Sequence, residues 1–250
     1  MWAREKTQSI LNRSLMVLSC LLLLELAVSA QWVSPLFFAK PSAALRTLWS
    51  QLANGKIAGM VFITLYEIGF AFLLATLLGL LLGYLLWRYR ILGLSYELLL
   101  SSLFASPLIL LYPLFLVAFG RTSAAIIALA ALFGLIPIAI NTRSALDHVN
   151  PVLIQVGSSM NLLPRQIFRH ILIPAAAPAV FSGFRLGLTY ILKTILGMEF
   201  IVNVGGIGKW ISEAAFRFET EEIYAGLFGV LILSVAFLHL LDRMERWIRR

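Results

Sequence analysis

The chain has 250 residues, of which 60% are hydrophobic and only 13% are charged. A soluble domain has about 25% charged residues and could not bury so much apolar surface, so the composition predicts a membrane protein. The net charge of +8 fits the Lys and Arg that collect at the cytoplasmic flanks of membrane helices, and no nucleic-acid partner is expected. Cys20 is the only cysteine, which excludes a disulfide within one chain.

Six segments are apolar over about 20 residues, the length that crosses a bilayer as a helix. In chain order they are residues 15–32, 57–87, 92–119, 123–141, 175–202 and 223–241. The second and third exceed the length that a bilayer requires, which leaves room for tilt or for turns at the membrane surface. The expected fold class is therefore all-α, a polytopic membrane protein with six transmembrane helices.

The first apolar segment has two interpretations. The basic start MWAREKTQSILNRS, the apolar stretch LMVLSCLLLLEL and the small residues VSA (28–30) follow the order of a cleavable secretory leader. The apolar stretch continues to Trp32, however, and Glu25 interrupts it, which favours a retained helix. We therefore expect residues 1–56 to form a transmembrane helix and an external loop, and residues 57–250 to form the core domain.

The distribution of positive charge predicts the orientation. With the N-terminus inside the cell, the segments on the cytoplasmic side carry twelve Lys and Arg residues, and the external segments carry six. Because Lys and Arg are enriched on the cytoplasmic side of membrane proteins, both termini are expected to be cytoplasmic. The same orientation places LIQVGSSMNLLPRQIFRHILIP (153–174), between the fourth and fifth segments, on the cytoplasmic side.

This cytoplasmic insert is amphipathic and too polar to cross a membrane. Asn150 and Pro151 suit the start of a short helix, Asn161 can end it because Asn tolerates left-handed backbone, and Pro164 suits the start of a second helix. The apolar side chains expected to make contacts are Val156, Met160, Leu162 and Leu163. Apolar side chains exposed on a short helix indicate a groove on a partner protein, and a helix lying on lipid headgroups is the alternative.

The insert resembles the cytoplasmic motif of the inner-membrane permease subunits of bacterial ABC importers. That motif has E-A-A, three residues, glycine, nine or ten residues and then I-x-L-P. Gln155, Val156 and Gly157 take the E-A-A positions, Asn161 takes the glycine position and Pro174 ends the motif. Two positions depart from the family: Gln155 lacks the usual negative charge, whereas Asn161 can keep the backbone conformation of a glycine.

A second set of residues resembles one branch of that family. Residues 183–208 begin with G-x-R at Gly183 and Arg185, carry Glu199 fourteen residues after the arginine and end in a glycine-containing turn. This pattern is similar to that of permeases for sulfonates, taurine, nitrate and bicarbonate. The likeness extends over nearly the whole chain.

The resemblance implies a type I ABC importer permease of the bacterial inner membrane, with a coupling helix at about residues 150–170. It implies as partners two ATPase subunits that bind ATP and Mg, a second permease (identical or related), a solute-binding protein and membrane lipid. This chain itself is expected to be no enzyme and to have no catalytic residues, cofactor or metal. Its own residues agree, because GGIGKW (205–210) has Trp where a phosphate-binding loop requires Ser or Thr.

Three charged residues inside the fifth segment are candidates for the substrate path: Arg185, Lys193 and Glu199. A charge at the membrane centre costs about 2.5–3.5 kcal/mol on insertion, so such side chains usually face a cavity or a partner. Lys193 either meets an anionic substrate or forms an ion pair, for which Glu67 and Glu97 are the candidates. Arg185 lies nearer the cytoplasmic end, where its side chain could also extend to the membrane surface.

Two other classes of protein fit the sequence less well. A stand-alone secondary transporter or channel often has two related halves, whereas the first and last three segments show no convincing repeat. An intramembrane enzyme would require a motif such as H-E-x-x-H or G-x-S-x-G, and the chain contains neither. For the permease, the subfamily implies a small organic or inorganic anion as cargo, such as a sulfonate, nitrate, bicarbonate or aromatic carboxylate, although related permeases carry thiamine precursors.

Overall fold

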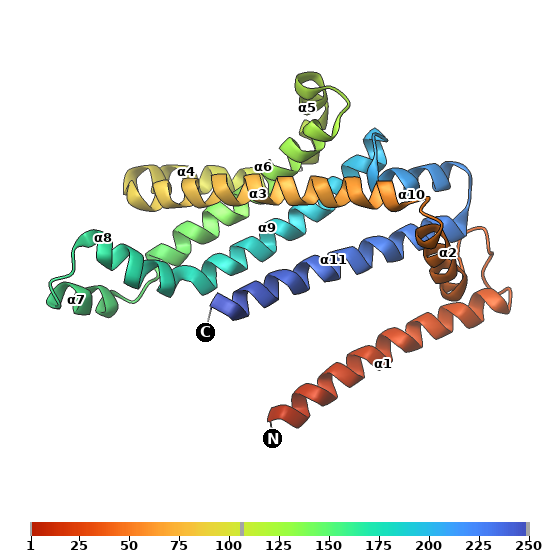
Figure 1. Ribbon diagram of the computed structural model, residues 1–250, viewed down its shortest axis with the longest axis horizontal. Coiled ribbons are helices and arrows are strands. Elements are labelled where there is room, and N and C mark those ends of the chain that lie inside the picture. The colour runs from red at the N-terminus through yellow and green to blue at the C-terminus, as the bar shows by residue number, and fades with distance from the viewer. Residues whose placement is uncertain (1, 106–107, 249–250) are drawn as a thin grey trace.

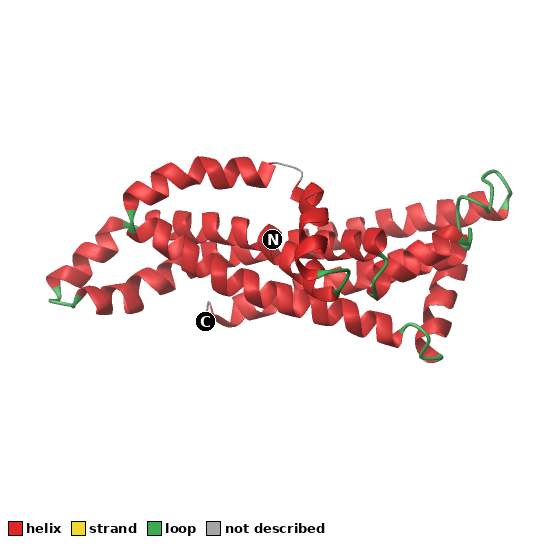
Figure 2. Cartoon of the chain, turned by 90° about the horizontal axis from the view of Figure 1, so that it is seen from above, coloured by secondary structure: helices red, strands yellow, loops and turns green. Residues whose placement is uncertain are grey.

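The computed structural model describes residues 2–105 and 108–248, and all regular structure in these ranges is helical (Figure 2). The elements are α1 (Trp2–Ser29), α2 (Pro41–Ala53), α3 (Ala58–Arg88), α4 (Arg90–Ala105), η1 (Leu108–Leu111), α5 (Tyr112–Phe119), α6 (Ser123–Asp147), α7 (Pro151–Ser159), α8 (Pro164–Ile167), η2 (Phe168–Leu172), α9 (Ile173–Val202), α10 (Gly206–Phe216) and α11 (Thr220–Ile248). The helices form an elongated bundle with α7 at one end and α2 and α10 at the other (Figure 1).

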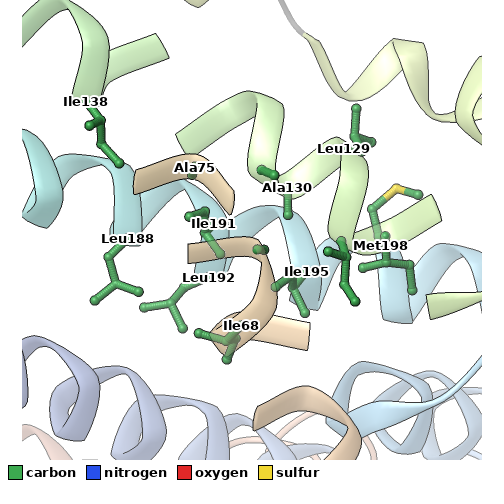
Figure 3. Packing of buried hydrophobic residues seen from close by; sticks show 14 of the residues in the cluster. Ile68, Ala75, Leu129, Ala130, Ile138, Leu188, Ile191, Leu192, Ile195 and Met198 are labelled. Atoms are coloured by element: carbon green, nitrogen blue, oxygen red, sulfur yellow. The ribbon is translucent and has the colours of Figure 1, made fainter. Parts of the chain in front are cut away.

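The centre of the bundle is formed by α3, α6 and α9, which approach one another at glycines. Gly134 of α6 lies against Ile191 of α9, where an added Cβ would come within 2.4 Å of the isoleucine side chain. A Cβ added at Gly187 of α9 would lie 2.8 Å from Ile138 and 2.9 Å from the Gly134 carbonyl oxygen. Small residues let helix backbones pack closely in membranes. Aliphatic side chains from all three helices fill the space between them (Figure 3).

Four helices in the described part of the chain are long and apolar enough to cross a membrane. They are α3, α6, the continuous helical stretch Pro164–Val202 and most of α11, Thr220–Arg246. These correspond to the second, fourth, fifth and sixth predicted segments. The first predicted segment falls in α1, whose apolar part, Leu15–Ser29, is shorter, so six spans remain a prediction.

The third predicted segment, residues 92–119, is not one continuous helix. It is divided among α4, the 3-10 turn η1 and α5, and residues 106–107 lie outside the described part. Pro113 stands in the first turn of α5, where its missing N–H leaves no helix hydrogen bond broken. Helix α4 runs alongside α3, whereas α5 projects away from it (Figure 1). A run of apolar residues predicts insertion into lipid, but not whether the backbone stays straight.

Helix α1 diverges from the bundle and is held by α2 near its C-terminal end (Figure 1). The Glu25 carboxylate accepts hydrogen bonds from the backbone N–H and the hydroxyl of Ser42, at 3.0 and 2.7 Å. Beyond this contact, the leucine side chains of α1 at positions 15, 18, 22, 23 and 26 are more than half exposed. Within one chain, α1 is therefore a helix with little tertiary contact over its apolar part.

Candidate functional site

The insert between α6 and α9 folds as the short helix α7 followed by a sharp turn. The Asn150 side chain accepts a 3.0 Å hydrogen bond from the Val152 N–H at the start of the helix. Asn161 adopts φ +56°, the left-handed backbone that the sequence predicts there. The Leu162 N–H then donates to the Gly157 carbonyl oxygen at 3.1 Å, which closes the turn. The predicted helix and its two end residues are confirmed.

Gly157 lies where α7 packs against the helix that follows the turn. It is buried, and an added Cβ would lie 2.6 Å from Cδ1 of Ile171. The two preceding motif residues, Gln155 and Val156, are exposed. The motif therefore has a small residue turned inward, which sets the distance between the two helices, and side chains turned outward, which remain available for contact.

One face of α7 and the turn after it presents apolar side chains to the surroundings. The apolar face comprises Val152, Leu153, Val156, Met160 and Leu163, with exposures of 56, 44, 52, 68 and 65%. Val152, Val156 and Met160 share one side because side chains four residues apart on a helix are neighbours. The predicted pair Leu162–Leu163 is divided, because Leu162 is half-buried. Sequence reasoning missed Val152 and Leu153, although Val152 precedes Val156 by one helical repeat.

After the turn, helical structure continues without interruption from Pro164 to Val202. At its start, the Leu163 N–H donates to the Gln166 side chain at 2.8 Å. Residues 168–172 form the π-helical turn η2, in which the Ile173 N–H bonds to the Phe168 carbonyl oxygen. Pro174 follows, and since it has no N–H and its ring requires space, a wider turn at this place is physically reasonable. The exposed Pro174 thus marks the entry into α9.

An aromatic cluster joins the π-helical turn to the last turns of α3. The ring of Phe168 stacks with that of Trp87 at a centroid distance of 6.0 Å and meets Tyr84 edge-on at 5.4 Å. Aromatic pairs of this kind contribute about 0.5–1.5 kcal/mol beyond the area that they bury. A displacement of α7 would therefore act on α3 through these rings as well as on α9 through the continuous helix.

Arg185 joins α9 to α11. Its Nη2 lies 2.5 Å from Oδ1 of Asp242 and 3.2 Å from Oε2 of Glu245, and both acids belong to α11. The side chains of Arg185 and Asp242 are 51 and 43% exposed. The guanidinium group predicted as a candidate for the substrate path is thus placed in an ion-pair cluster between two helices.

Lys193 is exposed on α9, and its Nζ lies 5.6 Å from the centroid of the Tyr190 ring. A predicted alternative, an ion pair with Glu67, is not formed, because the fully buried Glu67 carboxyl group has no hydrogen-bond partner in the described structure. The side chain of Glu97, the other predicted partner, lies outside the described part. An ammonium group over an aromatic ring remains able to meet an anion from its open side.

Glu199 is fully buried at the end of α9, where it fastens the turn to α10. Its Oε1 accepts a 2.6 Å hydrogen bond from the Thr64 hydroxyl, and its Oε2 accepts one of 2.8 Å from the Gly208 N–H. The Ile207 N–H in turn donates to the Thr64 oxygen at 2.9 Å. We call these four residues the Glu199 network. Sequence reasoning missed Thr64, because a single threonine in an apolar segment carries no pattern.

Residues 75–250 match the family described as the binding-protein-dependent transport system inner membrane component. Together with the helical fold, this match shows that the chain belongs to that family of ABC importer permeases. The prediction made from the motif is confirmed.

Individual relatives support the same branch of the family. The chain is 27% identical over 219 residues to a protein of Bacillus subtilis described as an aliphatic sulfonates transport permease, SsuC, with 86% of this chain and 79% of that one covered. It is 25% identical over 193 residues to the nitrate import permease NrtB of Synechococcus elongatus, covering 76 and 68% of the two chains. A chain of the MetNI methionine ABC transporter in an inward-facing conformation has a TM-score of 0.66 and 22% identity, covering 78% of this chain and 96% of that one, which shows a shared fold.

Proposed function

We propose that this chain is the transmembrane permease subunit of an ATP-driven importer, and that α7 is its coupling helix to a separate ATPase subunit. The observation that carries the proposal is the apolar face of α7, which the described part of the chain leaves exposed. Burying a Val, Leu or Met side chain contributes about 1.5–3 kcal/mol, so a few of them can dominate a small interface. A helix seated in a groove of a partner is the geometry that this face suits.

The connections of α7 suit it to transmit movement. Gly157 packs against Ile171, and Phe168 contacts rings at the end of α3. The helix beyond the turn continues to Val202 at the other end of the bundle. In the proposed mechanism the partner binds and hydrolyses ATP with Mg. Closure of the partner displaces α7, and α3 and α9 move with it, which changes the side of the membrane to which the substrate path is open.

A second permease, identical or related, is proposed to complete that path. In the described part of the chain, the contact region of α3, α6 and α9 is filled largely by aliphatic side chains and closely packed glycines. A path for a polar solute would then run along the surface of α9 and require another chain to enclose it. The exposed apolar part of α1 offers further surface for a second copy or for lipid.

The proposed cargo is a small anion, delivered by a solute-binding protein. Lys193 supports this choice, because it places an exposed ammonium group on α9 beside the Tyr190 ring. A lysine in a membrane segment favours a negatively charged partner. The names of SsuC and NrtB refer to sulfonates and nitrate, which are anions of the size that one lysine and a few hydroxyl groups could bind.

The coupling proposal also sets the orientation. The ATPase is cytoplasmic, so α7 lies on the cytoplasmic side of the bacterial inner membrane, and both termini lie on that side. The turn between α9 and α10 is then external, at the opposite end of the bundle from α7 (Figure 1).

Val156→Asp tests the proposal, because it places a charge in the centre of the apolar face. Ser158→Asp is the matched control, since Ser158 is also exposed on α7 but lies about 200° further round the helix. The tagged permease is purified after co-expression with its ATPase, and the ATPase activity that copurifies with it is measured. Val156→Asp should reduce it by about tenfold or more, the effect of losing 1.4 kcal/mol of binding, whereas Ser158→Asp should retain it. Normal bound ATPase and normal uptake in Val156→Asp would favour a helix that lies on lipid instead.

A further inference from the structure

Glu67 is a fully buried acid that the proposed transport mechanism does not use. It lies on α3, one helical turn after Thr64 and on the same side of the helix, so it neighbours the Glu199 network. The side chains of Ser123 and Glu199 lie close to its carboxyl group. Even so, neither of its two carboxyl oxygens has a hydrogen-bond partner in the described structure. Its side chain has an exposed fraction of 0%.

The carboxyl groups of Glu67 and Glu199 differ in the number of hydrogen-bond donors around them. Glu199 accepts hydrogen bonds from the Gly208 N–H and the Thr64 hydroxyl, which are the contacts that stabilise a negative charge. Glu67 accepts none. An ionised carboxylate buried without donors is strongly disfavoured, and a second negative charge nearby adds repulsion in a medium of low dielectric. A neutral carboxylic acid requires only one acceptor for its O–H group.

The cations on neighbouring elements are engaged elsewhere or exposed. Arg121, just before α6, donates to the Val202 carbonyl oxygen at 2.6 Å. Lys209 on α10 lies 3.7 Å from Glu213, and Lys193 on α9 faces outward. No group of three or more His, Cys, Asp or Glu side chains in the described ranges could hold a metal ion, and a hard cation requires about six oxygen ligands. A proton, in contrast, can be held by the two carboxyl groups that are present, one carrying it and the other accepting the hydrogen bond.

We propose that Glu67 is a proton-binding site: its carboxyl group carries a proton and donates it in a hydrogen bond to the Glu199 carboxylate. The proton removes one of two buried charges and gives Glu67 an acceptor. It also leaves Glu199 ionised, so that it continues to hold Thr64 and Gly208. The site lies at the end of the bundle opposite α7, where α9 turns into α10, and the proton stabilises that turn.

Infrared spectroscopy of the purified full-length chain in lipid nanodiscs at neutral pH tests the proposal directly. The wild type should show the carbonyl stretching band of a protonated carboxyl group, and this band should shift in D₂O. Glu67→Gln should lose that band. Glu213→Gln, which removes an acid of a half-exposed ion pair, is the control and should lose carboxylate absorption while keeping the acid band.

Thermal unfolding of the same samples gives a second, independent result. Glutamine matches a protonated glutamate in size, neutrality and donor, so Glu67→Gln should unfold at the wild-type temperature. Glu199→Gln should unfold at a lower temperature, because an amide has only one oxygen, whereas the carboxylate accepts from the Thr64 hydroxyl and the Gly208 N–H through two. The proposal is overturned if Glu67→Gln loses carboxylate absorption in place of the acid band, which would mean that Glu67 is ionised. It is equally overturned if Glu67→Gln fails to fold or is destabilised as much as Glu199→Gln.

Discussion

Arg185, Lys193 and Glu199 lie on the same helix, yet their surroundings differ. Arg185 is paired with two acids of α11, and Glu199 is buried in a hydrogen-bond network that holds the next turn. Lys193 alone of the three is exposed without an acidic partner in the described structure. These surroundings make Lys193 the charge that we propose to bind the solute, whereas the contacts of the other two charges stabilise the fold.

Lys193→Ala should reduce uptake of the anion by about tenfold or more, because a hydrogen bond to a charged group contributes about 1.5–3 kcal/mol. Assembly and basal ATP hydrolysis should stay near the wild-type level, since the ammonium group lies over the ring of Tyr190, a residue of the same helix. Lys193→Arg, which keeps the positive charge, is the control and should retain more uptake than Lys193→Ala. Uptake kinetics with radiolabelled anion provide the measurement, and equal kinetics for wild type and Lys193→Ala would argue for a purely structural lysine.

Capping residues and hydropathy predict where individual helices lie. They do not predict features that depend on contacts between segments far apart in the chain. The ends of α7 follow from Asn150, Pro151 and Asn161, because capping and left-handed backbone depend only on neighbouring residues. The division of residues 92–119 into several helices depends on how the chain packs. A hydropathy average over this apolar stretch does not show where the helix is interrupted. In the same way, the pairing of Thr64 with Glu199 joins residues 135 positions apart, which no local pattern can indicate.

The close approach of α6 and α9 can be tested at the scale of these two helices. Gly187→Ala adds a Cβ that would lie 2.9 Å from the Gly134 carbonyl oxygen, and overpacking of this kind costs about 1–3 kcal/mol. Gly69→Ala is the control, because a Cβ there meets nothing within 4 Å and alanine is the better helix former. Thermal unfolding in detergent should show a lower midpoint for Gly187→Ala only. Equal midpoints would mean that the two helices are not in contact at this glycine.

The whole molecule places its two candidate regions at opposite ends of the bundle. The apolar face of α7 lies at one end, and the Glu199 network lies at the other, with α3 and α9 extending between them (Figure 1). This separation fits the proposed mechanism, in which movement of α7 on one side of the membrane changes whether the substrate path is open on the other side. The packed core of α3, α6 and α9 connects the two ends.

The orientation can be tested with cysteines at the two ends. In a Cys20→Ser background, Ser159→Cys on α7 should react with a membrane-impermeant maleimide only after the cytoplasmic side is opened. Phe216→Cys at the end of α10, where the phenylalanine is 79% exposed, should react in intact cells. Labelling after detergent solubilisation confirms that both thiols are reactive. The opposite labelling pattern would place α7 outside the cell, where no ATPase could reach it.

Uptake by reconstituted vesicles tests whether this chain moves a solute by coupling to ATP hydrolysis in a partner. The permease, its ATPase and the solute-binding protein are assembled in vesicles, and accumulation of labelled anion is followed with ATP on the ATPase side. We expect accumulation that requires ATP, continues when ionophores remove all ion gradients, and is lost in Val156→Asp but retained in Ser158→Asp. Accumulation by the permease alone, driven by an ion gradient without ATP, would mean that the chain is a secondary transporter and not a subunit of an ATP-driven importer.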